Sequence, residues 1–290
     1  MIHVLVTGAS GLLGSVLCQR LAKLGVRVTA VIRTEGGIKT PGLRYLSMDL
    51  ARNDLARLCP NDVDIIIHLA QSSQFRNFPD RALDIFNVNV ASTAQLLDFA
   101  KHVGAKQFIY ASSGGVYGNG PEAFKENTPI IPSGQLGYYL GSKACGEILV
   151  QSYASFFNVK IIRPFFMYGP GQNRSMLIPR LMDSVANGKS ITLQGDEGIR
   201  INPVHVEDAS SILISALKLE ESASYNIAGP EVLSIRQISE EMGAFLGNPP
   251  VFKHVAGKPM DLVADISEIK SRLYMPNRHL RDFFAELRSL

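Results

Sequence analysis

The stretch of sequence that decides the fold reads Val4-Leu5-Val6-Thr7-Gly8-Ala9-Ser10-Gly11-Leu12-Leu13-Gly14. Three glycines in the spacing GxxGxxG follow a short apolar run and open a segment with helical spacing of apolar residues. In such a turn one glycine takes a positive φ, a second lets the backbone approach a pyrophosphate, and a third lets helix and strand pack closely. Between a strand and a helix, the triplet predicts a dinucleotide site rather than a plain glycine-rich turn. The phosphates would meet unpaired N–H groups at the helix start, and the expected contacts are Gly8, Ser10, Gly11, Leu12, Leu13 and Gly14.

Strand and helix patterns alternate through the first half of the chain. We expect strands at 2–6, 26–32, 63–69, 106–111 and 159–163, and helices at 12–24, 86–102 and 139–157. This alternation is typical of α/β proteins with a doubly wound parallel sheet, the Rossmann arrangement. We therefore predict a dinucleotide-binding domain over 1–166.

The pattern changes after Pro164, where prolines and glycines cluster. A short strand at 190–194 is expected between helices at 177–186 and 234–246. This indicates a small α+β substrate-binding part over 167–290, with one crossing back of the chain allowed.

Composition excludes several classes of protein. The chain has 290 residues with a net charge of +3, and its lysines and arginines are scattered, so no nucleic-acid partner is expected. Three cysteines, an odd count without CxxC, indicate a reducing cytoplasm and no disulfide framework. The six histidines are far apart, so no metal is expected. The apolar stretches are shorter than the ~20 residues of a membrane helix, and no signal peptide is expected.

The residue after the second predicted strand bears on the choice of cofactor. An acid usually meets the ribose hydroxyls of NAD there, but this chain has Ile32 followed by Arg33. A guanidinium matches a 2′-phosphate, so Arg33 favours NADP(H) over NAD(H), unless it is a solvated loop arginine. Asp49, with Leu50 beside it, is expected near the adenine, where Asp49 could accept from the amine; the alternative is a helix-capping aspartate.

Tyr139 and Lys143 form a Tyr-x-x-x-Lys pattern on the predicted helix at 139–157. Residues four apart lie on one helix face, and a lysine ammonium beside a phenol is expected to lower the phenol's pKa from its usual ~10. Tyr139 would then act as general acid or base, and Lys143 could also bond the nicotinamide ribose. Ser113, after the strand at 106–111, could hold the reacting carbonyl oxygen. Alone, the pattern has a plainer explanation, a core tyrosine and a surface lysine.

Together these segments resemble the extended short-chain dehydrogenase/reductase superfamily and, within it, the NAD-dependent epimerase/dehydratase family that acts on nucleotide sugars. The similarity runs from Val4 to about Ile238. Besides the glycine segment it includes His68-Leu69-Ala70, Asn89 with Thr93, Ser112-Ser113-Gly114-Gly115-Val116-Tyr117-Gly118, Tyr139-Leu140-Gly141-Ser142-Lys143 with Glu147, Arg163-Pro164, Tyr168-Gly169-Pro170-Gly171, Arg200 and His205-Val206-Glu207-Asp208-Ala209.

The resemblance implies roles for single residues. It makes Ser113, Tyr139 and Lys143 catalytic, with Tyr139 and Lys143 also at the cofactor and Ser113 also at the substrate. It implies that Leu69 and Ala70 lie along the cofactor, Pro164 by the nicotinamide and Arg200 on the substrate's diphosphate. The plainer alternative for Arg200 is a loop pair with Asp196 or Glu197. His68 and His205 are expected to be packed structural residues.

Two departures from the family pattern limit the function. Gly114 and Gly115 stand where dehydrating members carry an acid pair, so 4,6-dehydration is disfavoured. Phe166 stands in the substrate region where the family often has Asn, which leaves the sugar open.

We expect an epimerase or 4-ketoreductase of a nucleotide sugar, acting as a homodimer. The alternatives are an NADPH-dependent reductase of a non-sugar ketone and a non-catalytic dinucleotide-binding subunit.

Overall fold

The computed structural model describes residues 1–34, 40–52 and 59–287. The chain divides into two compact units. Unit 1 contains residues 1–118, 129–163 and 213–225, and unit 2 contains 119–128, 164–212 and 226–290, of which 288–290 lie outside the described residues.

A seven-stranded sheet has the order β3-β2-β1-β4-β5-β6-β9 within the described part of the chain. The five neighbouring pairs from β3 to β6 are parallel. The sequence explains why, because strands such as β1 and β5 are buried along their whole length, as strands covered on both faces must be. The predicted fold class is therefore confirmed. The strands are β1 (His3–Thr7), β2 (Arg27–Ile32), β3 (Leu43–Ser47), β4 (Ile65–His68), β5 (Gln107–Ala111), β6 (Asn158–Pro164) and β9 (Ala223–Ile227).

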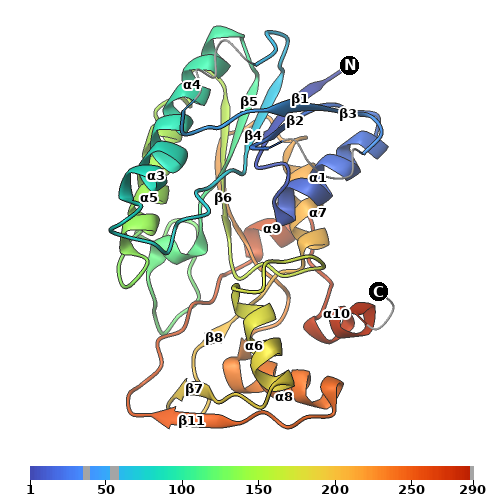
Figure 1. The fold of residues 1–290 in the computed structure, drawn as a ribbon. Coiled ribbons are helices and arrows are strands. Elements are labelled where there is room, and N and C mark those ends of the chain that lie inside the picture. Colours follow the sequence, from blue (N-terminus) through green and yellow to red (C-terminus); the bar gives the residue numbers. More distant parts are fainter. Residues whose placement is uncertain (35–39, 53–58, 288–290) are drawn as a thin grey trace. The chain divides into compact units, whose positions relative to one another are not determined.

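Helices cover both faces of this sheet in unit 1. The helix α1 (Leu12–Lys23) lies on one face, and α3 (Ala82–Phe86), α4 (Ser92–His102) and α5 (Gly137–Gln151) lie on the other (Figure 1). A π-helical turn, Asn87–Ala91, joins α3 to α4, so the helix predicted at 86–102 begins earlier than expected. The helix predicted at 139–157 ends at Gln151, and turns follow although the sequence stays partly apolar.

Unit 2 has its own core, built from helices and two small sheets. The helix α6 (Leu177–Ala186) has the predicted bounds, and α8 (Ile235–Leu246) begins with a reciprocal cap between Ser234 and Gln237 and ends at Gly247 with a φ of 70°. The remaining elements are β7 (Ile191–Gln194) parallel to β11 (Phe252–Val255), β8 (Arg200–Ile201) antiparallel to β10 (Leu233–Ser234), α7 (Val206–Ala216), which runs on into unit 1, α9 (Ser267–Arg272) and α10 (Leu280–Leu287).

His68 is the buried polar link between β4, β1 and α4. The hydroxyl of Thr93 lies 3.0 Å from Nε2 of His68, and the hydroxyl of Thr7 lies 2.6 Å from Nδ1. Because the Thr93 hydroxyl donates to the Asn89 carbonyl, we assign the ring proton to Nε2, with Nδ1 accepting from Thr7. Burial, and secondarily the charge of Lys143, lower the pKa of His68 to about 3. The expectation of a hydrogen-bonded core histidine is confirmed.

This burial makes the stability of unit 1 depend on pH. The unfolded chain takes up a proton at His68 near pH 6.5, whereas the folded chain does so only near pH 3, so acid favours unfolding between these values. We expect His68 to remove about 2 kcal/mol of stability between pH 7 and pH 5. Urea unfolding of the His68→Gln variant should show a loss smaller by that amount. The exposed His102→Gln is the control and should keep the wild-type loss; equal losses in all three proteins would contradict the prediction.

Candidate active site

The turn between β1 and α1 has no room for side chains. A Cβ on Gly14 would lie 2.1 Å from the Gly8 carbonyl oxygen, and one on Gly8, whose φ is 68°, would lie 2.8 Å from the backbone N of Ala70. Gly11 is the N-cap of α1 and supplies no side chain to its first N–H groups. This close backbone and these uncapped amides fit the pyrophosphate of a dinucleotide. Around them Ser10 is exposed, Leu12 is half-buried and Leu13 is buried.

The other predicted cofactor residues lie at neighbouring strand ends. The guanidinium of Arg33 follows β2 and donates to the Ser73 hydroxyl over 3.3 Å. The Asp49 carboxylate accepts from the backbone N–H of Ala51 at 3.0 Å and pairs with Arg52 at 3.6 Å. Asp49 therefore makes local contacts in the turn that follows it, and the structure describes no helix that begins there. Leu50 packs against the core of unit 1, while Ala70 is buried and Leu69 is half-buried after β4.

Tyr139 and Ser113 meet beyond the end of β5. Tyr139 is in the first turn of α5, and its hydroxyl is hydrogen-bonded with Ser113 and donates to the Gln71 side-chain oxygen at 2.8 Å. Lys143, one turn further along α5, is fully buried, and its ammonium donates to the Ala111 carbonyl at 2.8 Å. The three residues expected to act in catalysis thus converge on one end of β5.

The expected effect of Lys143 on Tyr139 is wrong in this structure. Burial raises the pKa of Tyr139 to about 12, opposed by the Ser113 hydrogen bond and the charge of Arg76. Burial also lowers the pKa of Lys143 to about 7, opposed by the charge of Glu147. Lys143 directs its proton to the Ala111 carbonyl, so it does not offset the burial of the phenol. Burial, not the lysine, sets the direction of the phenol's pKa.

A buried ion pair anchors α5 beneath Tyr139. The Glu147 carboxylate accepts from Nη2 of Arg163 at 2.7 Å and from Nε at 3.0 Å, and both side chains are almost fully buried. The same guanidinium donates to the Tyr117 hydroxyl at 2.5 Å. A bidentate carboxylate–guanidinium pair has a fixed geometry, so it fixes α5 against β6.

Sequence reasoning missed the loop that follows β4. Gln71 binds the Tyr139 hydroxyl, and the Phe75 ring lies 5.0 Å from the Tyr139 ring. The guanidinium of Arg76 lies 4.5 Å above the Phe75 ring. No local sequence signal marks these contacts, because Gln71 and Tyr139 are far apart in the chain and meet only when the sheet forms.

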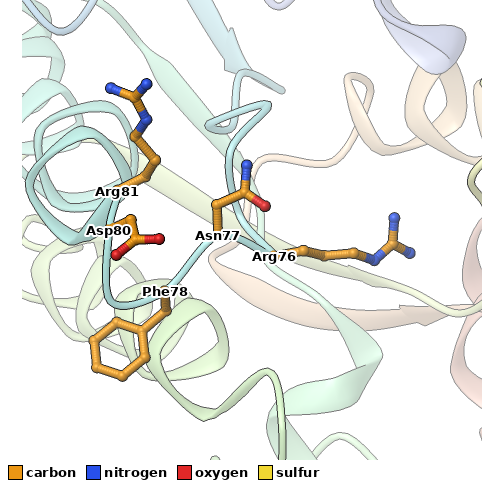
Figure 2. A pocket seen from close by; sticks show the side chains of 5 residues that line it. All are labelled: Arg76, Asn77, Phe78, Asp80 and Arg81. Carbon is orange, nitrogen blue, oxygen red and sulfur yellow. The ribbon is translucent and has the colours of Figure 1, made fainter.

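The same loop borders an open pocket of about 590 Å³. Figure 2 shows that Arg81 points upward and Arg76 points to the right of the view, so the two side chains diverge, while the Phe78 ring turns away from both. The two cations do not converge on one point, so the pocket does not form an anion site. It is lined by Arg76, Asn77, Phe78, Asp80 and Arg81.

Three predicted residues belong to unit 2. Pro164 is half-buried at the end of β6, and Phe166 packs against the unit's core with a φ of 39°, a strained value for a residue with a Cβ. Arg200 does not take the predicted alternative partners, Asp196 and Glu197. Its Nε and Nη2 donate to the Asp261 carboxylate at 2.8 and 2.7 Å, and its side chain stays 57% exposed.

The last observations concern His205, metal ligands and membrane helices. His205 is buried against the rings of Tyr168 and Phe283, which confirms its expected packing role. Among the residues that the structure describes, no group of three or more His, Cys, Asp or Glu could hold a metal ion, and no helix has the length and apolarity to cross a membrane.

The fold and the site are those of a dinucleotide-binding enzyme, and comparison with known proteins identifies its family. The structure matches that of UDP-glucuronic acid 4-epimerase from Bacillus cereus, solved with UDP-glucuronic acid and NAD, with a TM-score of 0.85, 28% identity, and coverage of 98% of this chain and 97% of the other. The chain is an enzyme of the short-chain dehydrogenase/reductase type. Residues 4–228 match a model of the NAD dependent epimerase/dehydratase family, and the chain belongs to that family.

Two curated relatives carry different activities. A dTDP-4-dehydro-6-deoxy-D-allose reductase from Streptomyces bikiniensis is 28% identical over 89% of this chain and 85% of its own length. A 2-alkyl-3-oxoalkanoate reductase from Shewanella oneidensis is 27% identical over 93% of this chain and 73% of its own length. The relatives of this chain thus include enzymes that act on nucleotide sugars and at least one enzyme that reduces a non-sugar ketone.

Proposed function

We propose that this enzyme is an NAD(P)-dependent epimerase or 4-ketoreductase of a nucleotide-activated sugar, with Tyr139 as its general acid and base. The observation that carries the proposal is the convergence of Tyr139, Ser113 and Lys143 at the end of β5. The substrates named for the Bacillus cereus epimerase and the Streptomyces bikiniensis reductase support the choice of a nucleotide sugar.

The proton chemistry follows from the state of Tyr139. Its high pKa keeps the phenol protonated at neutral pH, which suits a group that gives a proton to a ketone oxygen. A bound nicotinamide ring supplies or accepts the hydride. In reduction the carbonyl carbon gains the hydride, and the carbonyl oxygen takes the Tyr139 proton while Ser113 holds that oxygen. In oxidation the C–H bond of the alcohol breaks with its electron pair, and the hydroxyl proton passes to the phenolate form of Tyr139, which becomes a neutral phenol.

Dehydration does not fit this site. A 4,6-dehydratase needs an acid and a base beside the sugar, but Gly114 and Gly115 follow Ser113. A Cβ at Gly115 would lie 2.9 Å from the Leu140 side chain, so a carboxylate there would press on α5. In unit 2 we assign Arg200 to the substrate's diphosphate and Phe166 to the sugar pocket, since more than half of the Arg200 side chain stays exposed despite its pair with Asp261.

A second candidate is a reductase of a non-sugar ketone. It is favoured by the Shewanella oneidensis relative, whose name describes a 3-oxoalkanoate as its substrate. It is also favoured by Phe166, an apolar side chain in place of an amide. Both candidates use Tyr139 in the same way and differ in which substrate is turned over.

We further propose that the enzyme prefers NADP(H) to NAD(H). The reason is Arg33, whose guanidinium follows β2 and could pair with a 2′-phosphate. The related structure contains NAD, so the preference rests on this arginine alone.

We also propose a homodimer that acts in the cytoplasm. On α3, Leu83 is 76% exposed, and Phe86, three residues further along, is also exposed; on α5, Ile148 is 61% exposed. Large apolar side chains exposed on neighbouring helices are typical of a covered surface. The three free cysteines fit a reducing compartment.

The function is tested by replacing neighbouring tyrosines. Tyr139→Phe should lower kcat/KM by about 10²–10⁴-fold for whichever class the wild-type enzyme turns over, nucleotide sugars or 3-oxoalkanoates, because the proton donor is lost. Tyr138→Phe is the matched control, since its hydroxyl only donates to the Ala82 carbonyl at 3.1 Å, and it should change kcat/KM by less than about 3-fold. The substrate panel that wild-type enzyme turns over separates the two candidates. Full activity of Tyr139→Phe would refute the role of Tyr139.

The cofactor preference is tested by Arg33→Ala. Loss of a hydrogen-bonded charge pair should raise the Kd for NADPH about 10- to 100-fold and leave the Kd for NADH within about 3-fold. Fluorescence titration of the reduced cofactor measures both constants. Arg44→Ala, an exposed arginine on β3, is the control and should change neither. A wild-type enzyme that binds NADH as tightly as NADPH would overturn the preference.

The dimer is tested by Ile148→Asp on α5. A buried charge at a twofold interface would be close to its own copy, so the variant should sediment as one chain while wild type sediments as two. Leu24→Asp changes an equally exposed leucine at the end of α1 and should leave the dimer intact. Wild-type protein that sediments with the mass of one chain at all concentrations would exclude the dimer.

A further inference from the structure

The hydroxyl of Tyr139 has a direct partner that lies outside the family segments identified in the sequence. Gln71 is the second residue after the Leu69 that follows β4, and its Oε1 accepts the Tyr139 hydroxyl proton at 2.8 Å. Lys143 donates to the Ala111 carbonyl at 2.8 Å. The Tyr139 hydroxyl is therefore hydrogen-bonded to the primary amide of Gln71 and to the Ser113 hydroxyl.

A primary amide can bond a phenol in both of its protonation states. It carries an acceptor oxygen and a donor NH₂ on the same carbon, and a half-turn of the terminal torsion exchanges them. A neutral phenol donates to the oxygen, as it does here, and a phenolate would accept from the nitrogen. Gln71 is exposed, so a packed core does not fix its amide in one orientation.

We propose that Gln71 is a positioning residue for Tyr139, whose amide oxygen holds the phenol before proton transfer and whose amide N–H holds the phenolate afterwards. The proposal rests on the acid–base function given above for Tyr139. It extends that function to Gln71, which acts through its hydrogen bond with the tyrosine.

The proposal predicts how the pKa of Tyr139 changes with three different side chains at position 71. A hydrogen bond to a charged group is stronger than one to a neutral group, so the Gln71 amide should lower the pKa of Tyr139 relative to an apolar side chain. Methionine has a similar length and gives neither bond. An ionised glutamate accepts from the phenol but repels the phenolate. The pKa of Tyr139 should therefore rise from Gln71 to Gln71→Met and rise again to Gln71→Glu.

The experiment follows the tyrosine ring carbon that bears the hydroxyl, by NMR of ¹³C-tyrosine-labelled protein loaded with NAD⁺. Tyr139→Phe identifies the signal. The positive charge of the oxidised nicotinamide favours the phenolate and should lower the Tyr139 pKa from about 12 into a titration range of about pH 6 to about pH 11. Gln71→Met should raise the Tyr139 pKa by about one unit, and Gln71→Glu should raise it further. In turnover, Gln71→Met should lower kcat about 10-fold, with KM within about 3-fold.

The control is Gln74→Met, the same chemical change three residues along the loop. Gln74 accepts from Asn77 at 2.6 Å, and its variant should leave the Tyr139 titration unchanged. The proposal is overturned if Gln71→Met titrates as wild type does, if Gln71→Glu does not exceed Gln71→Met, or if wild-type Tyr139 stays protonated throughout. If the order holds but the wild type neither reduces nor epimerises nucleotide sugars and does not reduce 3-oxoalkanoates, the proposed function fails and the role of Gln71 stands.

Discussion

Three stretches of backbone meet without intervening side chains where β1 ends, and the rest of the site depends on that contact. Gly8 touches the backbone of Ala70, and Gly14 touches the carbonyl of Gly8, at distances that no Cβ would allow. The first contact fixes the end of β4 against β1, and the second fixes the first turn of α1. Residues after Ala70 start from this fixed point, so Gln71 can reach Tyr139 on a helix far along the chain. One steric constraint thus positions both the uncapped amides of α1 and the partner of the phenol.

The site combines polar groups with deep burial, and burial decides their charges. Tyr139 stays protonated, His68 stays neutral and Lys143 titrates near neutrality, in each case because burial disfavours the charged form. The Glu147–Arg163 pair is the contrasting case, since each charge satisfies the other through two hydrogen bonds. A buried pair of this kind is a weak source of stability but a strong geometric restraint. Its contribution here is the position of α5.

Features with a local cause could be predicted from the sequence. The glycine spacing indicated the β1–α1 turn, and the apolar periodicity gave the bounds of α6 correctly. Helix geometry also predicted that Tyr139 and Lys143 lie one turn apart on α5. It could not predict their pKa values, which depend on burial and on the hydrogen bond of Lys143 to the Ala111 carbonyl. The partner of Arg200 could not be predicted, because Asp261 reaches it from a distant segment whereas nearby acids looked sufficient. The roles assigned to these residues remain predictions.

The order of the sheet has a consequence for how the protein is made. The outer edge of β6 is covered by β9, yet the chain builds residues 164–212, all of them in unit 2, before it returns to supply that strand. During synthesis on the ribosome the nascent sheet would therefore expose an open edge while a second core is forming. Such an edge can pair with other chains, so this interval is when the protein would most need a chaperone. A fragment that stops at the end of β6 would keep this edge permanently open and would be prone to aggregate.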